Sequence, residues 1–161
     1  MTGAISLALI LACAPPEVAP QTIQAIIQVE SRGDPLAIGI NLPEQDSRSA
    51  HPTSTAAAMR VVKAVLAQGG SVDLGLMQVN NRNLKALGYG IEQMFDPCTN
   101  IRAGALILQE AYGRAVQVLP PGQLALRAAL SAYNTGDLER GFANGYVERY
   151  ERFTALHLSD E

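Results

Sequence analysis

The chain has 161 residues and a formal net charge of −3, and 48% of its residues are apolar while 17% are charged. This composition is typical of a folded globular protein and excludes a disordered chain. The length fits one domain with its own core, so residues 1–161 are interpreted as a single domain. No run of Lys and Arg could neutralise a row of phosphates, which excludes a nucleic-acid-binding protein.

The apolar stretch Ile5 to Cys13 is about half as long as a membrane span. It resembles a signal-peptide core, but no Lys or Arg precedes it, and Ile10-Leu11-Ala12-Cys13 only faintly resembles a lipoprotein cleavage box. The favoured interpretation is a first helix that ends before Pro15-Pro16, with any export signal absent from this sequence. A signal-peptide remnant stays open as the alternative.

A mainly helical chain is predicted beyond this stretch. A second helix begins near Pro20, because proline suits a first helical turn, and it ends at Glu30 shortly before Gly33. Apolar residues cover most of its surface, so we expect this helix to be largely buried. Further helices are expected over Thr55–Gln68, Asp96–Val118, Gln123–Tyr133 and Asn144–Leu156.

Little β-structure is expected. Pro35–Thr55 is rich in Gly, Pro, Asn and Ser and is interpreted as irregular, and no role is assigned to Leu42–Thr53. Ala37–Asn41 and Val72–Leu74 are predicted to pair as a small sheet or hairpin, while Val72–Asn80 is interpreted as a loop or turn that enters a helix. The predicted fold class is mainly α, a helical domain with at most a small sheet.

The two cysteines, Cys13 and Cys98, are too few for a disulfide-dense scaffold, and their spacing matches no metal motif. They are interpreted either as two buried thiols or as one long-range disulfide. The histidines, His51 and His157, have no second ligand at metal-binding spacing and no serine in a catalytic triad setting, so they are interpreted as surface residues. Neither a metal site nor a cofactor is predicted.

Glu30 is an unusual residue at the end of an apolar helix. A helix C-terminus disfavours a carboxylate, and burial does the same, so both would raise the pKa of this side chain. A glutamic acid with a raised pKa is suited to donate a proton near neutral pH. The alternative is an exposed last residue that pairs with Arg32, and this segment alone favours that alternative.

Two other segments place polar side chains where neither a core nor a plain turn requires them. Gly75-Leu76-Met77-Gln78-Val79-Asn80 combines a glycine, which lets the backbone approach a ligand, with amides that suit sugar hydroxyl and acetamido groups. Ala132-Tyr133-Asn134-Thr135-Gly136 combines a tyrosine at a helix end with an asparagine and a glycine turn. Each segment in isolation is also explained by core residues beside a turn.

Taken together and in this order, the three segments resemble the lysozyme-like lytic transglycosylases. The family pattern is a Glu-Ser pair at a helix end, here Glu30-Ser31, followed by Gly-Leu-Met-Gln and then Ala-Tyr-Asn-x-Gly. The resemblance extends over about Cys13 to Val147. Within the family, the chain resembles the branch associated with type IV secretion and conjugation systems. The stretches that carry it are Cys13–Pro15, Val29–Ile38, Val72–Asn80, Phe95–Cys98 and Ser131–Asp137.

This resemblance implies a lysozyme-like α+β fold, a Cys13–Cys98 disulfide and a periplasmic location. It implies that Glu30 cleaves peptidoglycan glycan strands, without cofactor or metal, and acts first as acid and then as base. Asp34 and Asp73 are the nearest second carboxylates, and neither has a compelling context. Supporting roles fall to Ser31, Gly75, Met77, Gln78, Asn80, Tyr133 and Asn134.

The resemblance implies local opening of the cell wall for assembly of a secretion channel, and therefore secretion-system components as further partners. The protein is expected to be a monomer. Two alternatives stay open. A muramidase would hydrolyse the same bond with water, and an inactive wall-binding assembly factor would have lost the activity, although all three motif segments are intact.

Overall fold

The computed structural model describes residues 5–158, which form helices and one small sheet. The helices are α1 (Leu7–Cys13), α2 (Pro20–Glu30), α3 (Thr55–Ala67), α4 (Leu84–Leu87), α5 (Pro97–Ala115), α6 (Gln123–Thr135), α7 (Arg140–Ala143) and α8 (Tyr146–Leu158), with short 3-10 turns at Asn81–Asn83 and Glu92–Phe95. The strands are β1 (Ile38–Asn41), β2 (Arg48–Ala50), β3 (Ser71–Leu74) and β4 (Val79–Asn80).

The predicted fold class, mainly α with a small sheet, is confirmed. The long helices begin where the sequence provides N-terminal signals. Pro20 opens α2, and Asp96 precedes Pro97 and accepts a hydrogen bond from Thr99 N at 2.8 Å, which satisfies a free N–H of α5. Ser54 caps α3 in the same way.

The sheet is antiparallel with strand order β2-β1-β3-β4. The predicted pairing of Ala37–Asn41 with Val72–Leu74 is confirmed, since Ile38 lies opposite Leu74 and Ile40 opposite Val72. The irregular stretch of the prediction contains β2, an exposed edge strand that pairs with β1. The segment interpreted as a loop entering a helix is a hairpin instead, because Val79 and Asn80 pair back onto β3.

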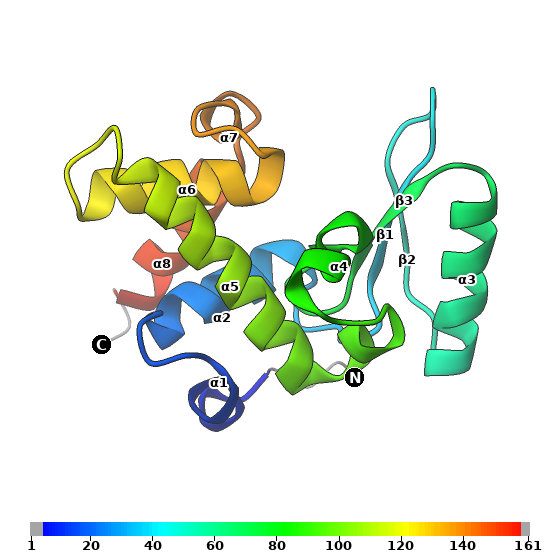
Figure 1. The fold of residues 1–161 in the computed structure, drawn as a ribbon. Coiled ribbons are helices and arrows are strands. Elements are labelled where there is room, and N and C mark those ends of the chain that lie inside the picture. The colour runs from blue at the N-terminus through cyan, green and yellow to red at the C-terminus, as the bar shows by residue number, and fades with distance from the viewer. Residues whose placement is uncertain (1–4, 159–161) are drawn as a thin grey trace.

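The elements form two groups, a sheet side and a helical side that contains the long helix α5. Figure 1 shows the sheet and α3 on one side of the molecule and α2, α6 and α8 on the other, with α5 running from the middle of the molecule across α2 to α6. α2 is buried as predicted, with Ile23, Ile26 and Ile27 in the same core cluster as Ile101 and Leu108 of α5. This arrangement places the C-terminal end of α2 where the helical part and the sheet meet.

A disulfide joins Cys13 at the end of α1 to Cys98 at the start of α5, with the two Cα atoms 5.1 Å apart. The predicted pairing is therefore confirmed. Because 85 residues separate the cysteines, the chain-entropy model gives a stabilisation of about 4–5 kcal/mol. No helix within residues 5–158 combines the length and the apolar character that crossing a membrane requires.

Candidate active site

A cleft of about 370 Å³ lies where α2, the sheet, α5 and α6 meet. Its walls bring together residues that are far apart in sequence. They come from α2 (Glu30), the β3–β4 hairpin (Asp73, Gln78, Val79, Asn80), Asn83, α5 (Ile107, Glu110, Ala111, Arg114) and the end of α6 (Ala132, Tyr133, Asn134, Gly136). The three motif segments of the sequence thus converge on one cleft.

Glu30 is the last residue of α2, and the chain leaves the helix directly after it. Arg32 and Gly33 both have positive φ angles, 54° and 83°, which turn the backbone away from the helix axis. The carboxyl group is partly buried in the wall of the cleft. The structure therefore does not support the alternative of a freely exposed Glu30.

Burial raises the pKa of Glu30 from 4.5 to about 7. The negative charge of Asp73 adds to this increase, while the Tyr146 hydroxyl and the charge of Arg149 oppose it. Tyr146 Oη makes no hydrogen bond of ordinary length and angle among the described residues, but it is close enough to Glu30 to lower the pKa of that carboxyl. A pKa near 7 lets Glu30 carry a proton near neutral pH and also release it.

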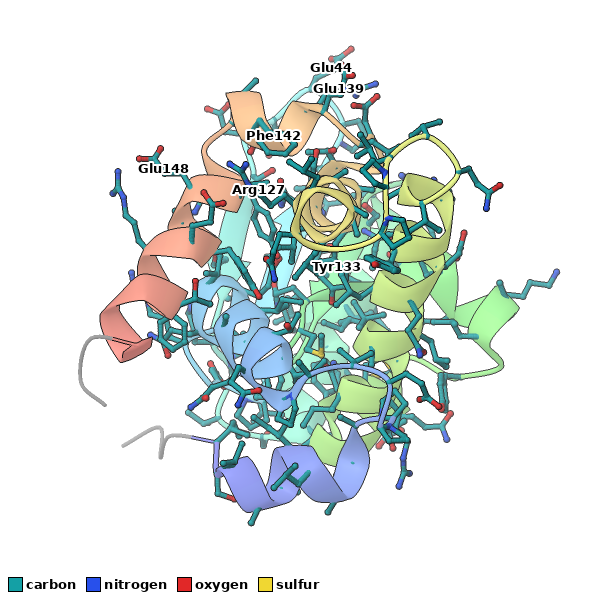
Figure 2. All side chains as sticks on the ribbon, turned by 90° about the vertical axis from the view of Figure 1, so that its left-hand side faces the viewer. Glu44, Arg127, Tyr133, Glu139, Phe142 and Glu148 are labelled. Carbon is teal, nitrogen blue, oxygen red and sulfur yellow. A yellow bond between two sulfur atoms is a disulfide. The ribbon has the colours of Figure 1, made fainter. Side chains whose placement is uncertain are left out.

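Tyr133 connects α6 to the motif segment of the β3–β4 hairpin. Its hydroxyl donates a hydrogen bond to Met77 O at 2.6 Å. Burial and the nearby charges of Glu30 and Asp73 raise the pKa of Tyr133 well above its ordinary value, so its hydroxyl remains a donor. Figure 2 shows Tyr133 below α6, directed toward the middle of the molecule.

Gln78 occupies the turn of the hairpin in a left-handed conformation, with φ at 50°. Its Nε2 donates to Ala37 O at 3.1 Å and to Gly75 O at 2.9 Å, so both amide hydrogens are used within the protein. The side-chain oxygen is left as the acceptor that a ligand in the cleft could use.

Gly75 and Met77 lie beneath the cleft and do not line it. A Cβ at Gly75 would come within 2.4 Å of Met94 O, so the glycine is required by a neighbouring protein segment and not by an approaching ligand. The Met77 side chain is fully buried against Gly104 of α5, where an added Cβ would lie 2.6 Å from the Met77 sulfur. The structure therefore does not bring the Met77 side chain to a surface that a sugar could contact.

Ser31 is buried and holds the end of α2 against the same hairpin. Its Oγ donates to Leu76 O at 2.7 Å and accepts from Gly33 N at 3.2 Å. The hydroxyl thus stabilises the turn after Glu30 and sets the distance between this turn and the hairpin. Any influence on Glu30 acts through the backbone.

Asn80 of β4 and Asn134 of α6 both line the cleft. Asn80 Nδ2 donates to Asp73 Oδ1 at 2.8 Å, and Asn134 Oδ1 accepts from Asn144 Nδ2 at 2.8 Å. Of the two second acids considered from the sequence, Asp73 joins Glu30 in the cleft. Asp34 does not line it, and its Oδ2 lies 2.8 Å from His51 Nδ1.

Sequence reasoning missed Asn100 and Tyr146. Asn100 is fully buried in α5 and donates to Leu74 O and Met94 O while accepting from Met77 N. An asparagine on the apolar face of a helix was the available signal. Tyr146 gave no such signal, because a tyrosine four residues before Tyr150 on one helix face is typical of a core. No three His, Cys, Asp or Glu side chains gather as a possible metal site in the described part of the chain.

A helical domain with a small antiparallel sheet and a single partly buried glutamate in the intervening cleft has the lysozyme-like α+β architecture. The family model described as "Transglycosylase SLT domain" matches residues 10–155, which is most of the chain. The chain belongs to this family.

Several curated proteins are similar to the chain. Protein virB1 of Agrobacterium fabrum is 45% identical over 139 residues, covering 86% of this chain and 55% of that protein. Type IV secretion system protein virB1 of Brucella abortus is 42% identical over 134 residues, covering 81% of this chain and 53% of that protein. Invasion protein IagB of Salmonella typhimurium is 30% identical over 105 residues, covering 57% of this chain and 59% of that protein.

The chain spans about half the length of these virB1 relatives. Their similarity confirms the predicted resemblance to the branch associated with type IV secretion. No solved structure matches the chain.

Proposed function

We propose that this chain is a peptidoglycan lytic transglycosylase that cleaves the β-1,4 bond between N-acetylmuramic acid and N-acetylglucosamine. The observation that carries the proposal is Glu30, whose pKa is raised to about 7 and which lies in a cleft formed by all three motif segments. Membership of the SLT domain family supports the same activity.

The reaction begins with proton transfer from Glu30 to the glycosidic oxygen. The acetamido oxygen of the muramyl sugar attacks the anomeric carbon as the bond to the leaving sugar breaks, which forms a cyclic oxazolinium ion. Glu30, now a carboxylate, removes the proton from the C6 hydroxyl of the same sugar. The C6 oxygen then attacks the anomeric carbon and closes a 1,6-anhydro ring, so no water is consumed and Glu30 regains its proton.

The remaining residues divide into substrate contacts and supports. Gln78, Asn80 and Asn134 line the cleft and supply amide groups for sugar hydroxyl and acetamido groups. Tyr146 of α8 lowers the pKa of Glu30, and Tyr133 of α6 lies near enough for the charge of Glu30 to raise the pKa of its hydroxyl. The supporting residues hold the backbone that carries these groups: Ser31, Gly75 and Met77.

The name of the Brucella abortus relative, type IV secretion system protein virB1, supports a role in a type IV secretion system. The chain would act in the periplasm on the wall and open it locally for the channel, in contact with other secretion-system components. The disulfide fits an oxidising compartment of this kind.

Hydrolysis by a muramidase is the second candidate, and one observation favours it. Asp73 lines the same cleft as Glu30, so a second carboxylate is available to activate a water molecule. The products separate the two activities, because hydrolysis leaves reducing ends and the transglycosylase reaction leaves 1,6-anhydromuramyl ends.

The test is digestion of purified peptidoglycan followed by mass spectrometry of the soluble products. Anhydromuramyl ends are expected from the parent and none from Glu30→Gln. Glu139→Gln, an exposed carboxylate outside the cleft, is the matched control and should release the parent's products. Reducing ends from the parent, or parent-like clearing by Glu30→Gln, would overturn the proposal.

A further inference from the structure

Asp73 is the second carboxylate of the cleft, and its contacts are unusually well defined. It lies on β3, opposite Gly39 of β1 and Asn80 of β4. Its Oδ2 accepts from Asn41 Nδ2 at 2.7 Å, and its Oδ1 accepts from Asn80 Nδ2 at 2.8 Å. The side chain is only partly buried, so it remains open to the cleft that it lines.

The orientation of both amides is determined by further hydrogen bonds. Asn80 Oδ1 accepts from Arg82 N at 3.0 Å, and Asn41 Oδ1 accepts from Ser47 Oγ at 3.1 Å. The Nδ2 groups of both asparagines are therefore directed at residue 73. Only a side chain with a hydrogen-bond acceptor on each side satisfies both donors. The surroundings select a carboxylate at this position and orient it.

This carboxylate retains capacity for a ligand. Each carboxylate oxygen has two lone-pair directions, and each oxygen of Asp73 uses one of them for an asparagine. The groups that influence the pKa of Glu30 come from different elements: Asp73 from β3, and Tyr146 and Arg149 from α8. Asp73 is the one carboxylate among these three groups, and it lines the cleft from the sheet side.

We propose that Asp73 is a further catalytic residue, which accepts a hydrogen bond from the acetamido N–H of the muramyl sugar and stabilises the positive charge of the oxazolinium ion. This inference rests on the proposed function. As the acetamido oxygen attacks the anomeric carbon, positive charge develops on the acetamido nitrogen, and a fixed carboxylate beside it lowers the energy of that state. Asp73 neither gains nor loses a proton, which fits its role as an acceptor on both oxygens.

A purely structural role is the competing explanation, since Asp73 also connects three strands through two asparagines. The two roles differ in their kinetic signature. A structural role predicts lower stability with little specific loss in kcat, whereas the catalytic role predicts a lower kcat in a folded protein. Asp73→Asn is the test variant because it removes the charge and keeps the size.

We expect Asp73→Asn to lower kcat on peptidoglycan by about 10²-fold with KM changed by less than about threefold. Because the charge of Asp73 raises the pKa of Glu30, its removal should also move the alkaline limb of the pH–rate profile to lower pH. Glu110→Gln is the charge-matched control, since it removes another carboxylate from the same cleft and should leave that limb in place. Asp73→Glu, which keeps the charge but displaces it, should retain the parent's limb with a reduced kcat.

Thermal unfolding of each variant separates folding from catalysis, and Asp73→Ser replaces Asp73→Asn if the latter is not folded. A folded variant whose kcat stays within about threefold of the parent would overturn the inference while the proposed function stands. The proposed function is tested separately, by whether the parent releases anhydromuramyl ends or reducing ends. Loss of activity in Asp73→Asn together with reducing ends from the parent would assign Asp73 to water activation and overturn its acetamido role.

Discussion

The two walls of the cleft are stabilised in different ways. On the sheet side, the polar side chains of Asp73, Gln78 and Asn80 are held by hydrogen bonds of 2.7–3.1 Å, with Asn100 supporting the hairpin from below. On the helical side, Glu30 and Tyr146 rely on burial, and Tyr146 Oη makes no hydrogen bond of ordinary geometry among the described residues.

This difference indicates a division of tasks. A hydrogen-bonded wall presents acceptors and donors in fixed positions, as recognition of sugar hydroxyl and acetamido groups requires. A wall whose ionisable side chains are buried shifts their pKa values instead, because burial disfavours the charged form. Recognition is therefore expected to depend mainly on the sheet side, with Asn134 as the contribution of α6, and proton transfer on the helical side, and variants in each wall can test that.

The largest effect is expected for Glu30→Gln. Loss of the general acid should lower kcat by about 10³-fold or more, while the KM for peptidoglycan stays within about threefold, because the sheet wall is unchanged. Steady-state turbidity and product assays measure both constants. A large increase in KM would mean that the helical wall also carries substrate recognition.

Asn100→Leu should produce the largest loss of stability, by about 3–5 kcal/mol. It leaves Leu74 O, Met94 O and Met77 N buried without their partner, and each such group costs about 1–3 kcal/mol. Urea unfolding measures the change, and Arg102→Leu on the exposed face of α5 is the control. An unfolding free energy equal to that of the control would show that the sheet wall does not depend on this asparagine.

The stability of the parent should depend on pH through Glu30. Its pKa is about 7 in the folded protein against 4.5 in the unfolded chain, so the protonated form is favoured by folding. This contribution is fully present below pH 4.5 and is lost as pH rises through 7. The loss reaches at most about 3 kcal/mol, at 1.36 kcal/mol for each unit of pKa difference.

Glu30→Gln tests this assignment because glutamine imitates the protonated acid. The variant should match the stability of the parent at pH 4 and exceed it at pH 8, measured by urea unfolding in matched buffers. Equal stabilities at both pH values would show that burial does not control the protonation of Glu30.

The smallest effect is expected for Tyr146→Phe. Because the hydroxyl lowers the pKa of Glu30, its removal should raise that pKa and move the alkaline limb of the pH–rate profile to higher pH. The limb should move in the opposite direction from that of Asp73→Asn, and kcat should fall by about threefold to tenfold. Stability should change little, since the buried hydroxyl lacks a well-formed hydrogen bond.

Tyr150→Phe serves as the control for Tyr146→Phe. It removes a hydroxyl from the same helix, where Tyr150 Oη donates to Thr22 Oγ1 at 3.4 Å, away from the cleft. Its pH–rate profile should coincide with that of the parent. A shift of equal size in both variants would assign the effect to α8 as a whole.

The longer helices were predictable because their signals are local, whereas the one-turn helices α4 and α7 were not predicted. Pro20, Ser54 and Asp96 mark helix beginnings, and apolar periodicity follows each of them. The pairing of β1 with β3 was also predictable from two short extended pieces. Strands β2 and β4 were missed, since an exposed edge strand and a two-residue strand depend on their partners more than on their own residues.

The amino-acid sequence was sufficient to identify the segments that carry polar side chains at helix ends and turns, and the order of these segments indicated the family. How each of these residues is used became clear from the fold. Gly75 and Met77 lie beneath the cleft, whereas Asp73, without a compelling context in the sequence, lies beside Glu30. Burial, the distance between charges and the direction of hydrogen bonds all depend on neighbours that are remote in the chain, and these neighbours also determine the pKa of Glu30.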